Sequence, residues 1–177
     1  MPQEYTVIEM LSKLVSFETI SSESNLDMIM FIKDYLNSYQ IESHLVFNDH
    51  KTKANLFAQI GPNIEGGVLV SGHTDVVPVK GQKWRTNPFK VTETNNRLFG
   101  RGTCDMKGFN ALILAAVPTL IKAKLTKPIQ IALSYDEEIG CLGAPRMIQR
   151  IQEILPKAAA VIVGEPTNMQ IVDGHKT

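Results

Sequence analysis

The sequence has 177 residues, of which 44% are hydrophobic, so one domain with a sizeable buried core is expected, and disordered and fibrous classes are excluded. It contains 18 Lys and Arg residues and 18 Asp and Glu residues, which gives a formal net charge of zero. Because there is no global positive charge, neither nucleic acid nor an anionic membrane is expected as a partner, and a small-molecule substrate fits better.

Three features of the sequence predict a cytoplasmic protein. The two cysteines, Cys104 and Cys141, are too few for a disulfide framework, and both are expected to be reduced and packed as small apolar side chains. The first residues, MPQEYTVIEM, lack the basic and apolar regions of a signal peptide. The longest apolar run, 111–121, is shorter than the roughly 20 residues that a membrane helix requires, and it contains a proline.

Hydrophobic periodicity predicts helices and strands that alternate along the chain. In chain order, these are helices at 6–17 and 26–39, strands at 44–47, 55–60 and 68–70, a helix at 106–124, a strand at 129–135, a helix at 145–155 and a strand at 159–163. Pro118 lacks an amide proton and is expected to kink or divide the longest helix, and the apolar last strand is expected to be buried. The alternation predicts an α/β domain with a mixed, mostly parallel sheet flanked by helices.

The segment between 71 and 105 contains a loop with the aromatic residues Trp84 and Phe89. Aromatic side chains in a loop can line the mouth of a substrate site, and they can equally cover a hydrophobic core. The sequence leaves both interpretations of this loop open.

Potential metal ligands follow three of the apolar strands. His73 and Asp75 follow VLVSG, the triplet 136–138 (Asp-Glu-Glu) follows IQIALSY, and Glu165 follows AAVIVG. Sites in open α/β sheets form at the carboxyl ends of the strands. A fourth segment, GRGTCDMKG, places Asp105 in a glycine-rich turn just before the longest helix. We therefore expect four segments to converge on one site.

One histidine gathered with several carboxylates points to a divalent cation, because like charges repel unless a proton or a cation is present. Imidazole with carboxylates suits zinc, cobalt or manganese, and a bridging carboxylate permits two ions roughly 3.5–4 Å apart. Taken singly, a His-x-Asp or an Asp-Glu-Glu sequence is more often structural. Their occurrence together and in order favours a metal site.

Local geometry gives several of these residues different roles. In an extended segment, His73 and Asp75 lie on the same side, so Asp75 can accept a hydrogen bond from the imidazole. Neighbouring Glu137 and Glu138 point in opposite directions, so one can bind metal while the other faces a water molecule as a base. Pro166 restricts Glu165 to an extended conformation.

The four segments resemble the metal-site motifs of the M20 family of metallopeptidases and deacylases in both order and spacing. The segments are His73-Thr74-Asp75-Val76-Val77-Pro78, GRGTCDMKG at 100–108, Asp136-Glu137-Glu138-Ile139-Gly140 and Gly164-Glu165-Pro166-Thr167. The resemblance implies a zinc-aminopeptidase-like catalytic domain that binds two divalent metal ions, with zinc expected and cobalt as the alternative.

The resemblance also implies a role for each site residue. His73 and Glu165 would hold one ion, Glu138 would hold the other, and Asp105 would bridge them. Glu137 would be the general base. Asp75 would orient His73.

Within the family, the segments GTCDMKGF and YDEEIGCLGA most resemble the branch that deacetylates N2-acetyl-L-ornithine. This implies hydrolysis of a linear amide in arginine biosynthesis, with L-ornithine and acetate as products. Succinyl-diaminopimelate desuccinylase activity, or another deacylase or carboxypeptidase activity of the family, is the alternative.

Members of the family have two parts that this sequence lacks. One is a smaller dimerisation or lid domain, and the other is a C-terminal segment that supplies a final histidine ligand. Residues 1–177 are therefore expected to form the N-terminal part of the catalytic domain, and a full-length form is expected to be a homodimer. An inactive, truncated metal-binding fragment is the alternative, and the role of His175 stays open between a junction to the lid domain and a tail.

Overall fold

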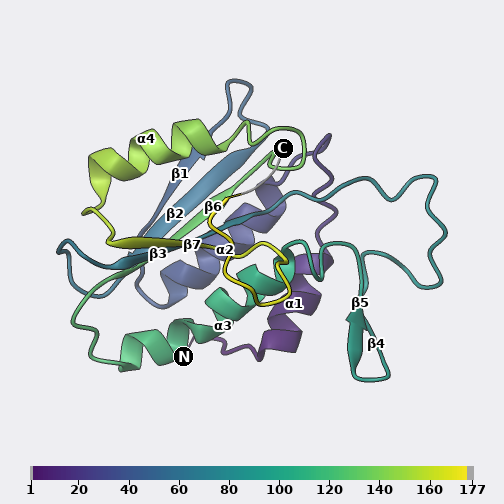
Figure 1. The fold of residues 1–177 in the computed structure, drawn as a ribbon, viewed down its shortest axis with the longest axis horizontal. Helices are drawn as coiled ribbons and strands as arrows, with labels where there is room; N and C mark the ends of the chain where they lie inside the picture. The colour runs from purple at the N-terminus through teal and green to yellow at the C-terminus, as the bar shows by residue number, and fades with distance from the viewer. Residues whose placement is uncertain (1, 175–177) are drawn as a thin grey trace.

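The computed structural model describes residues 2–174 and shows a central β-sheet with helices on both faces (Figure 1). The helices are α1 (Val7–Val15), α2 (Leu26–Ser38), α3 (Lys107–Lys122) and α4 (Ala144–Ile154). The strands of the sheet are β1 (Ser43–Phe47), β2 (Ala54–Ile60), β3 (Val68–His73), β6 (Ile129–Ser134) and β7 (Ala160–Val163). A separate hairpin contains β4 (Thr92–Thr94) and β5 (Arg97–Phe99).

The sheet has the strand order β1-β2-β6-β3-β7. Strand β2 is antiparallel to both of its neighbours, β1 and β6, whereas β3 is parallel to both β6 and β7. Every strand of this sheet except β2 therefore runs in the same direction. This confirms the predicted mixed, mostly parallel sheet flanked by helices.

Two hydrophobic layers cover the faces of the sheet, because successive strand residues point to opposite sides. In β2, Leu56 faces the layer formed by α1, α2 and α3, and Phe57 faces the layer under α4. The first layer includes Met10, Leu14, Ile32, Leu114 and Leu133. The second includes Ala132 and Met147.

Helix α1 begins at a capping box. The side chain of Thr6 accepts a hydrogen bond from the amide of Glu9 at 3.2 Å, and the Glu9 carboxylate accepts one from the amide of Thr6 at 2.8 Å. These bonds satisfy two amide groups that the helix itself leaves without partners. They explain why the helix starts at Val7 after a polar residue.

Pro118 lies inside α3 but does not divide it, since the helix continues to Lys122. A proline at this position cannot donate to the carbonyl four residues earlier, which belongs to Leu114. The hydroxyl of Tyr35 in α2 donates to that carbonyl at 3.0 Å instead. The buried phenol thus compensates for the hydrogen bond that Pro118 removes, and it ties α2 to α3.

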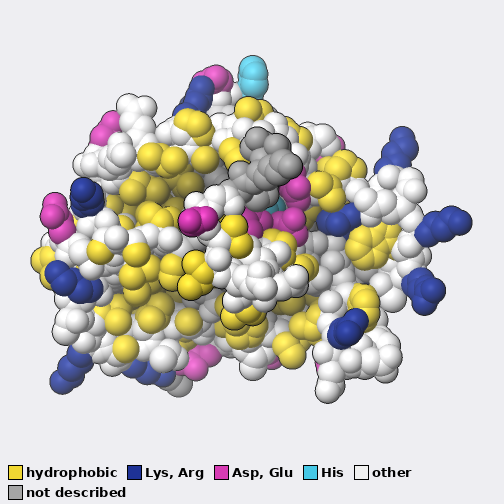
Figure 2. All heavy atoms as spheres, in the orientation of Figure 1, with side chains coloured by type: hydrophobic (Ala, Val, Ile, Leu, Met, Phe, Trp, Pro, Cys, Tyr) yellow, Lys and Arg dark blue, Asp and Glu magenta, His cyan; other side chains and the backbone are white. Residues whose placement is uncertain are grey.

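Strand β7 corrects the prediction of a buried last strand. Among residues 2–174 it pairs only with β3, and the side chains of Val161, Ile162 and Val163 are between 51% and 60% exposed. Figure 2 shows hydrophobic side chains spread over the part of this face where Figure 1 draws β7 between α4 and α3. An apolar run indicates burial only if neighbours cover the strand, and in residues 2–174 β7 is the edge of the sheet.

The segment after β3 contains a hairpin, β4–β5, for which the hydrophobic pattern has no signal. Asn95 and Asn96 connect β4 to β5 with positive φ angles of 51° and 57°, as in tight two-residue turns. The preceding loop extends away from the sheet (Figure 1). Trp84 in this loop stacks on Arg101, and neither Trp84 nor Phe89 belongs to a hydrophobic layer, whereas Val91 at the end of the loop packs against the first layer.

Candidate metal centre

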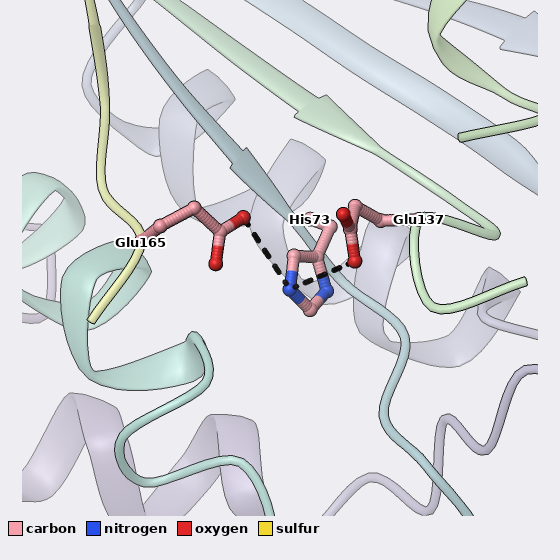
Figure 3. Close-up of side chains that lie close together, drawn as sticks. All are labelled: His73, Glu137 and Glu165. Carbon is pink, nitrogen blue, oxygen red and sulfur yellow. Dashed lines mark ion pairs between the residues drawn. The ribbon is translucent and has the colours of Figure 1, made fainter. Parts of the chain in front are cut away.

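The carboxyl ends of β3, β6 and β7 share one edge of the sheet, because these strands are parallel. His73 is the last residue of β3, and Glu137 and Glu165 lie in the loops that follow β6 and β7. Figure 3 shows the two carboxylates pointing toward the imidazole from opposite sides. Asp105 reaches the same place from the loop before α3. The four segments therefore converge as the strand order requires.

The distances around the imidazole define the cluster. Nε2 of His73 lies 2.9 Å from Oδ1 of Asp105, 3.7 Å from Oε2 of Glu137 and 3.9 Å from Oε1 of Glu165. Two groups have ligand atoms within 4.8 Å of one another: His73 with Glu137 and Glu165, and His73 with Asp105 and Glu138. All of the predicted ligands are thus brought together, and in Figure 2 acidic side chains surround a partly visible histidine.

The other ring nitrogen of His73 is held by Asp75. Nδ1 lies 2.9 Å from the backbone carbonyl oxygen of Asp75 and 3.5 Å from its carboxylate. The predicted contact with the carboxylate is therefore present, but the shorter contact is with the main chain. When the ring is neutral, donation from Nδ1 leaves the lone pair of Nε2 facing the carboxylates. Both ligand groups include His73, and its Nε2 is the ring nitrogen that faces the carboxylates. The two groups therefore compete for one nitrogen ligand.

Asp75 also holds the segment that carries Glu137 and Glu138. Its carboxylate accepts hydrogen bonds from the Ser21 hydroxyl at 2.6 Å and from the amides of Glu137 at 3.0 Å and Glu138 at 3.3 Å. Burial of Asp75 opposes its ionisation, but hydrogen bonds from His73, Ser21 and Glu137 lower its pKa below the usual value. A single ionised carboxylate thus links the ends of β3 and β6.

The electrostatics of the cluster favour a positive charge at its centre. Burial of His73 opposes its protonation, but hydrogen bonds with Asp75 and Asp105 raise the pKa of the imidazole to about 9. Burial raises the pKa of Glu138, and the nearby charge of Asp105 raises it further. An imidazole nitrogen among carboxylate oxygens is a donor set that divalent zinc, cobalt or manganese accepts. These residues therefore fit a divalent metal ion.

Two supports of the site were missed in the sequence. The side chain of Asn110 in α3 donates to the backbone carbonyl of His73 at 2.6 Å and so fixes the end of β3. Gly164 packs on the ring of Phe109, where a Cβ atom would clash, so the residue before Glu165 must be glycine. Phe109 and Asn110 belong to no motif. Their position at the start of α3, four and five residues after Asp105, was the only available signal for them.

Both cysteines differ from the prediction, because Cys104 and Cys141 are exposed rather than packed. Cys104 lies in the turn before α3, and Cys141 lies in the loop between β6 and α4. The thiol of Cys141 is 3.7 Å from Oε1 of Glu137. His175 lies outside the described residues.

The chain belongs to Peptidase family M20/M25/M40, which matches residues 69–175. It is 36% identical over 177 residues to acetylornithine deacetylase from Buchnera aphidicola subsp. Acyrthosiphon pisum (strain Tuc7), an alignment that covers 96% of this chain and 45% of the relative. The chain thus spans less than half the length of this curated relative. Among the described residues, no helix is both long and apolar enough to cross a membrane.

Two solved structures share the fold. The M20 family metallo-carboxypeptidase Sso-CP2 from Sulfolobus solfataricus is 25% identical, with a TM-score of 0.78 over 90% of this chain and 37% of that one. The YXEP protein of Bacillus subtilis, described as a dinuclear metal binding peptidase from the M20 family, is 20% identical, with a TM-score of 0.61 over 89% of this chain and 41% of that one. Both likenesses support the architecture derived from the strand order.

Proposed function

We propose that this chain carries part of the catalytic centre of a metal-dependent amide hydrolase. The observation that carries the proposal is the convergence of four segments on His73, which belongs to both groups of potential ligands. The positions of Asp75 and of the buried imidazole support it, because a ligand needs a fixed tautomer and orientation. The dinuclear metal binding named for the YXEP protein supports two ions in a full-length form, which we propose to be zinc, with cobalt as the alternative.

In the proposed site, following the family resemblance, His73 and Glu165 would hold one ion, Glu138 would hold the other, and both ions would share the Asp105 carboxylate; all four side chains occur in the two ligand groups. Bound ions supply positive charge that polarises an amide carbonyl and makes water more acidic. Glu137 accepts the proton of the attacking water and returns it to the departing amine. Its side chain is 31% exposed, so water and substrate can reach it.

Glu137 occurs in one of the two ligand groups, so its proposed role as the base needs a separate test. Glu137→Gln keeps the shape of the side chain and removes its basicity. If Glu137 is the base, this variant binds metal like the wild type and loses hydrolysis. Weakened metal binding would instead assign Glu137 as a ligand.

The proposed substrate is a small N-acylated amino acid, N2-acetyl-L-ornithine, which is cleaved to L-ornithine and acetate in arginine biosynthesis. The name of the Buchnera aphidicola relative supports this substrate. Other deacylase or carboxypeptidase substrates of the family, including succinyl-diaminopimelate, are the competing proposal, and the name of Sso-CP2 favours a carboxypeptidase. We also propose a cytoplasmic location, with no nucleic acid or membrane as partner.

The proposed reaction is tested by acetate release from N2-acetyl-L-ornithine in the presence of Zn²⁺ or Co²⁺. The 177-residue chain should be compared with a form extended to the length of the relatives. We expect metal-dependent release by the extended form and its loss in Glu137→Gln. Faster turnover of succinyl-diaminopimelate would overturn the choice of substrate.

We propose that residues 1–177 form the N-terminal part of the catalytic domain and that the full-length form is a homodimer. The exposed apolar side chains of β7 support the first point, because further strands or helices of a larger domain could cover this edge. A chain that binds metal without turnover is the second candidate function. In the part of the chain that the structure describes, both ligand groups share one imidazole, and this favours the second candidate because one ion would then lack a nitrogen ligand.

A further inference from the structure

The reversed strand β2 brings a second set of polar side chains to the metal centre. Because β2 is antiparallel to β6, its amino end lies beside the carboxyl end of β6. The register pairs Leu56 with Leu133, and its continuation places Lys53 opposite Asp136. Asp136 directly precedes Glu137 and Glu138. The start of β2 therefore contacts the loop that carries two of the proposed functional carboxylates.

Lys53 joins two segments that both donate hydrogen bonds to Asp75, one at Ser21 and one at 136–138. Its ammonium group donates to Oδ1 of Asp136 at 2.6 Å and to the backbone carbonyl of Ser21 at 2.5 Å. The side chains of Lys53 and Asp136 are only 13% and 10% exposed. Ser21 in turn donates its hydroxyl to Asp75, which accepts the amides of Glu137 and Glu138. The ammonium group thus closes a connected network around Asp75.

Asn55 holds the two ends of the same loop. Its side-chain oxygen accepts a hydrogen bond from the amide of Tyr135 at 3.1 Å, and its side-chain amide donates to the carbonyl of Gly143 at 2.9 Å. Asn55 is fully buried, so these bonds do not compete with water. Because residues 53 and 55 are two apart in an extended segment, both side chains reach the loop from one side of β2.

We propose that Lys53, supported by Asn55, is a positioning residue that sets the directions of the Glu137 and Glu138 carboxylates. The inference rests on the proposed metal-dependent function. Lys53 balances the charge of Asp136, which would otherwise add to the repulsion among the carboxylates of the site. It also holds Asp136 in a left-handed conformation, with φ of 57°, from which the next two amides point to Asp75.

Replacement of the lysine tests this role through metal binding. Lys53→Met removes the charge and keeps most of the stem, and we expect it to weaken Co²⁺ binding about tenfold, the lower end of losses for residues that support metal ligands. Lys53→Arg keeps the charge and should recover most of the affinity. The matched control is Lys122→Met, because the Lys122–Glu4 ion pair is a distant surface contact with both side chains more than half exposed.

A second variant tests the same ion pair independently, in case Lys53→Met misfolds. Asp136→Asn removes the other charge of the pair, and asparagine tolerates the left-handed conformation that Asp136 adopts. We expect it to weaken Co²⁺ binding to a similar extent, and the double variant to lose little more. Additive losses would show that the two residues act separately and would overturn the inference.

Amide hydrogen exchange separates the inference from the proposed function, since it needs no metal. In Lys53→Met the amides of Glu137 and Glu138 should exchange faster than in the wild type, and Lys122→Met should leave them unchanged. If the wild type binds no Co²⁺, the proposed function fails, yet the exchange rates still decide the positioning role. If Lys53→Met lowers only the melting temperature, with unchanged exchange and affinity, the role is merely structural and the inference is overturned.

Discussion

At His73, the two ring nitrogens have different partners, and that difference makes the imidazole a potential ligand. Nδ1 contacts the main chain of Asp75, and Nε2 faces Asp105 and two glutamates. Burial then limits the ring to one orientation, since His73 is only 1% exposed. A mobile surface histidine with the same carboxylates nearby would offer no such fixed nitrogen.

Asp75→Asn should weaken metal binding without a change in size. An asparagine cannot accept hydrogen bonds through its NH₂ group, so it loses one of the contacts with Ser21 and the amides of Glu137 and Glu138. We expect Co²⁺ affinity to fall about 10- to 100-fold in an equilibrium titration. Asp49→Asn, at an exposed ion pair with Arg146, is the control. Equal affinity for the two variants would argue against the role of Asp75.

The predicted site residues could be placed from the sequence because each follows a strand or precedes a helix that the hydrophobic pattern reveals. Lys53 and Asn55 could not be placed in the same way. Their contacts with 135–143 depend on β2 lying antiparallel to β6, and the sequence contains no signal for that pairing. Residues that act across strands therefore require the sheet order.

Among the elements, the predicted bounds agree with the structure to within two residues except at β3 and at the missed hairpin. Strand β3 continues to His73, past the predicted end at Val70. Ser71 and Gly72 have weak strand propensity, which explains the early predicted end, but both residues pair with β6. The β4–β5 hairpin is short and polar, so hydrophobic periodicity gives no signal for it. Its Asn95-Asn96 turn was the available clue.

The contact between α2 and α3 predicts a measurable loss in Tyr35→Phe. This variant leaves the buried carbonyl of Leu114 without a donor, and it should lower the free energy of unfolding by about 1–2 kcal/mol in urea titrations. Tyr39→Phe is the control, because the Tyr39 hydroxyl bonds to Gln3 at the surface and its loss should cost less than about 0.5 kcal/mol.

The stability difference between the wild type and Tyr35→Phe should depend on pH. Burial raises the pKa of Tyr35 above its usual value of 10.0, so the folded chain keeps a proton that the unfolded chain loses. Ionisation of Tyr35 therefore stabilises the unfolded wild type as the pH rises above 10, and Tyr35→Phe has no such group. The stability difference between the two proteins should shrink above pH 10, and a constant difference would contradict the burial argument.

For the whole molecule, four distant segments meet because parallel strands place their carboxyl ends at one edge and α3 starts beside them. The same topology leaves β7 exposed at the other side of β3. The sequence predicted the convergence, since it follows from the alternation of strands and helices. It could not predict the exposure of β7, which depends on what else packs beside that strand.

The account as a whole depends on a cation site centred on His73, so we would first titrate the metal-free, 177-residue chain with Co²⁺ and follow absorption and heat. Because both ligand groups include His73, whose Nδ1 already contacts Asp75, we predict one tight ion for the 177-residue chain, lost in His73→Ala and kept in His50→Ala, which changes an exposed histidine. Unchanged binding in His73→Ala, or two equally tight ions, would contradict the account.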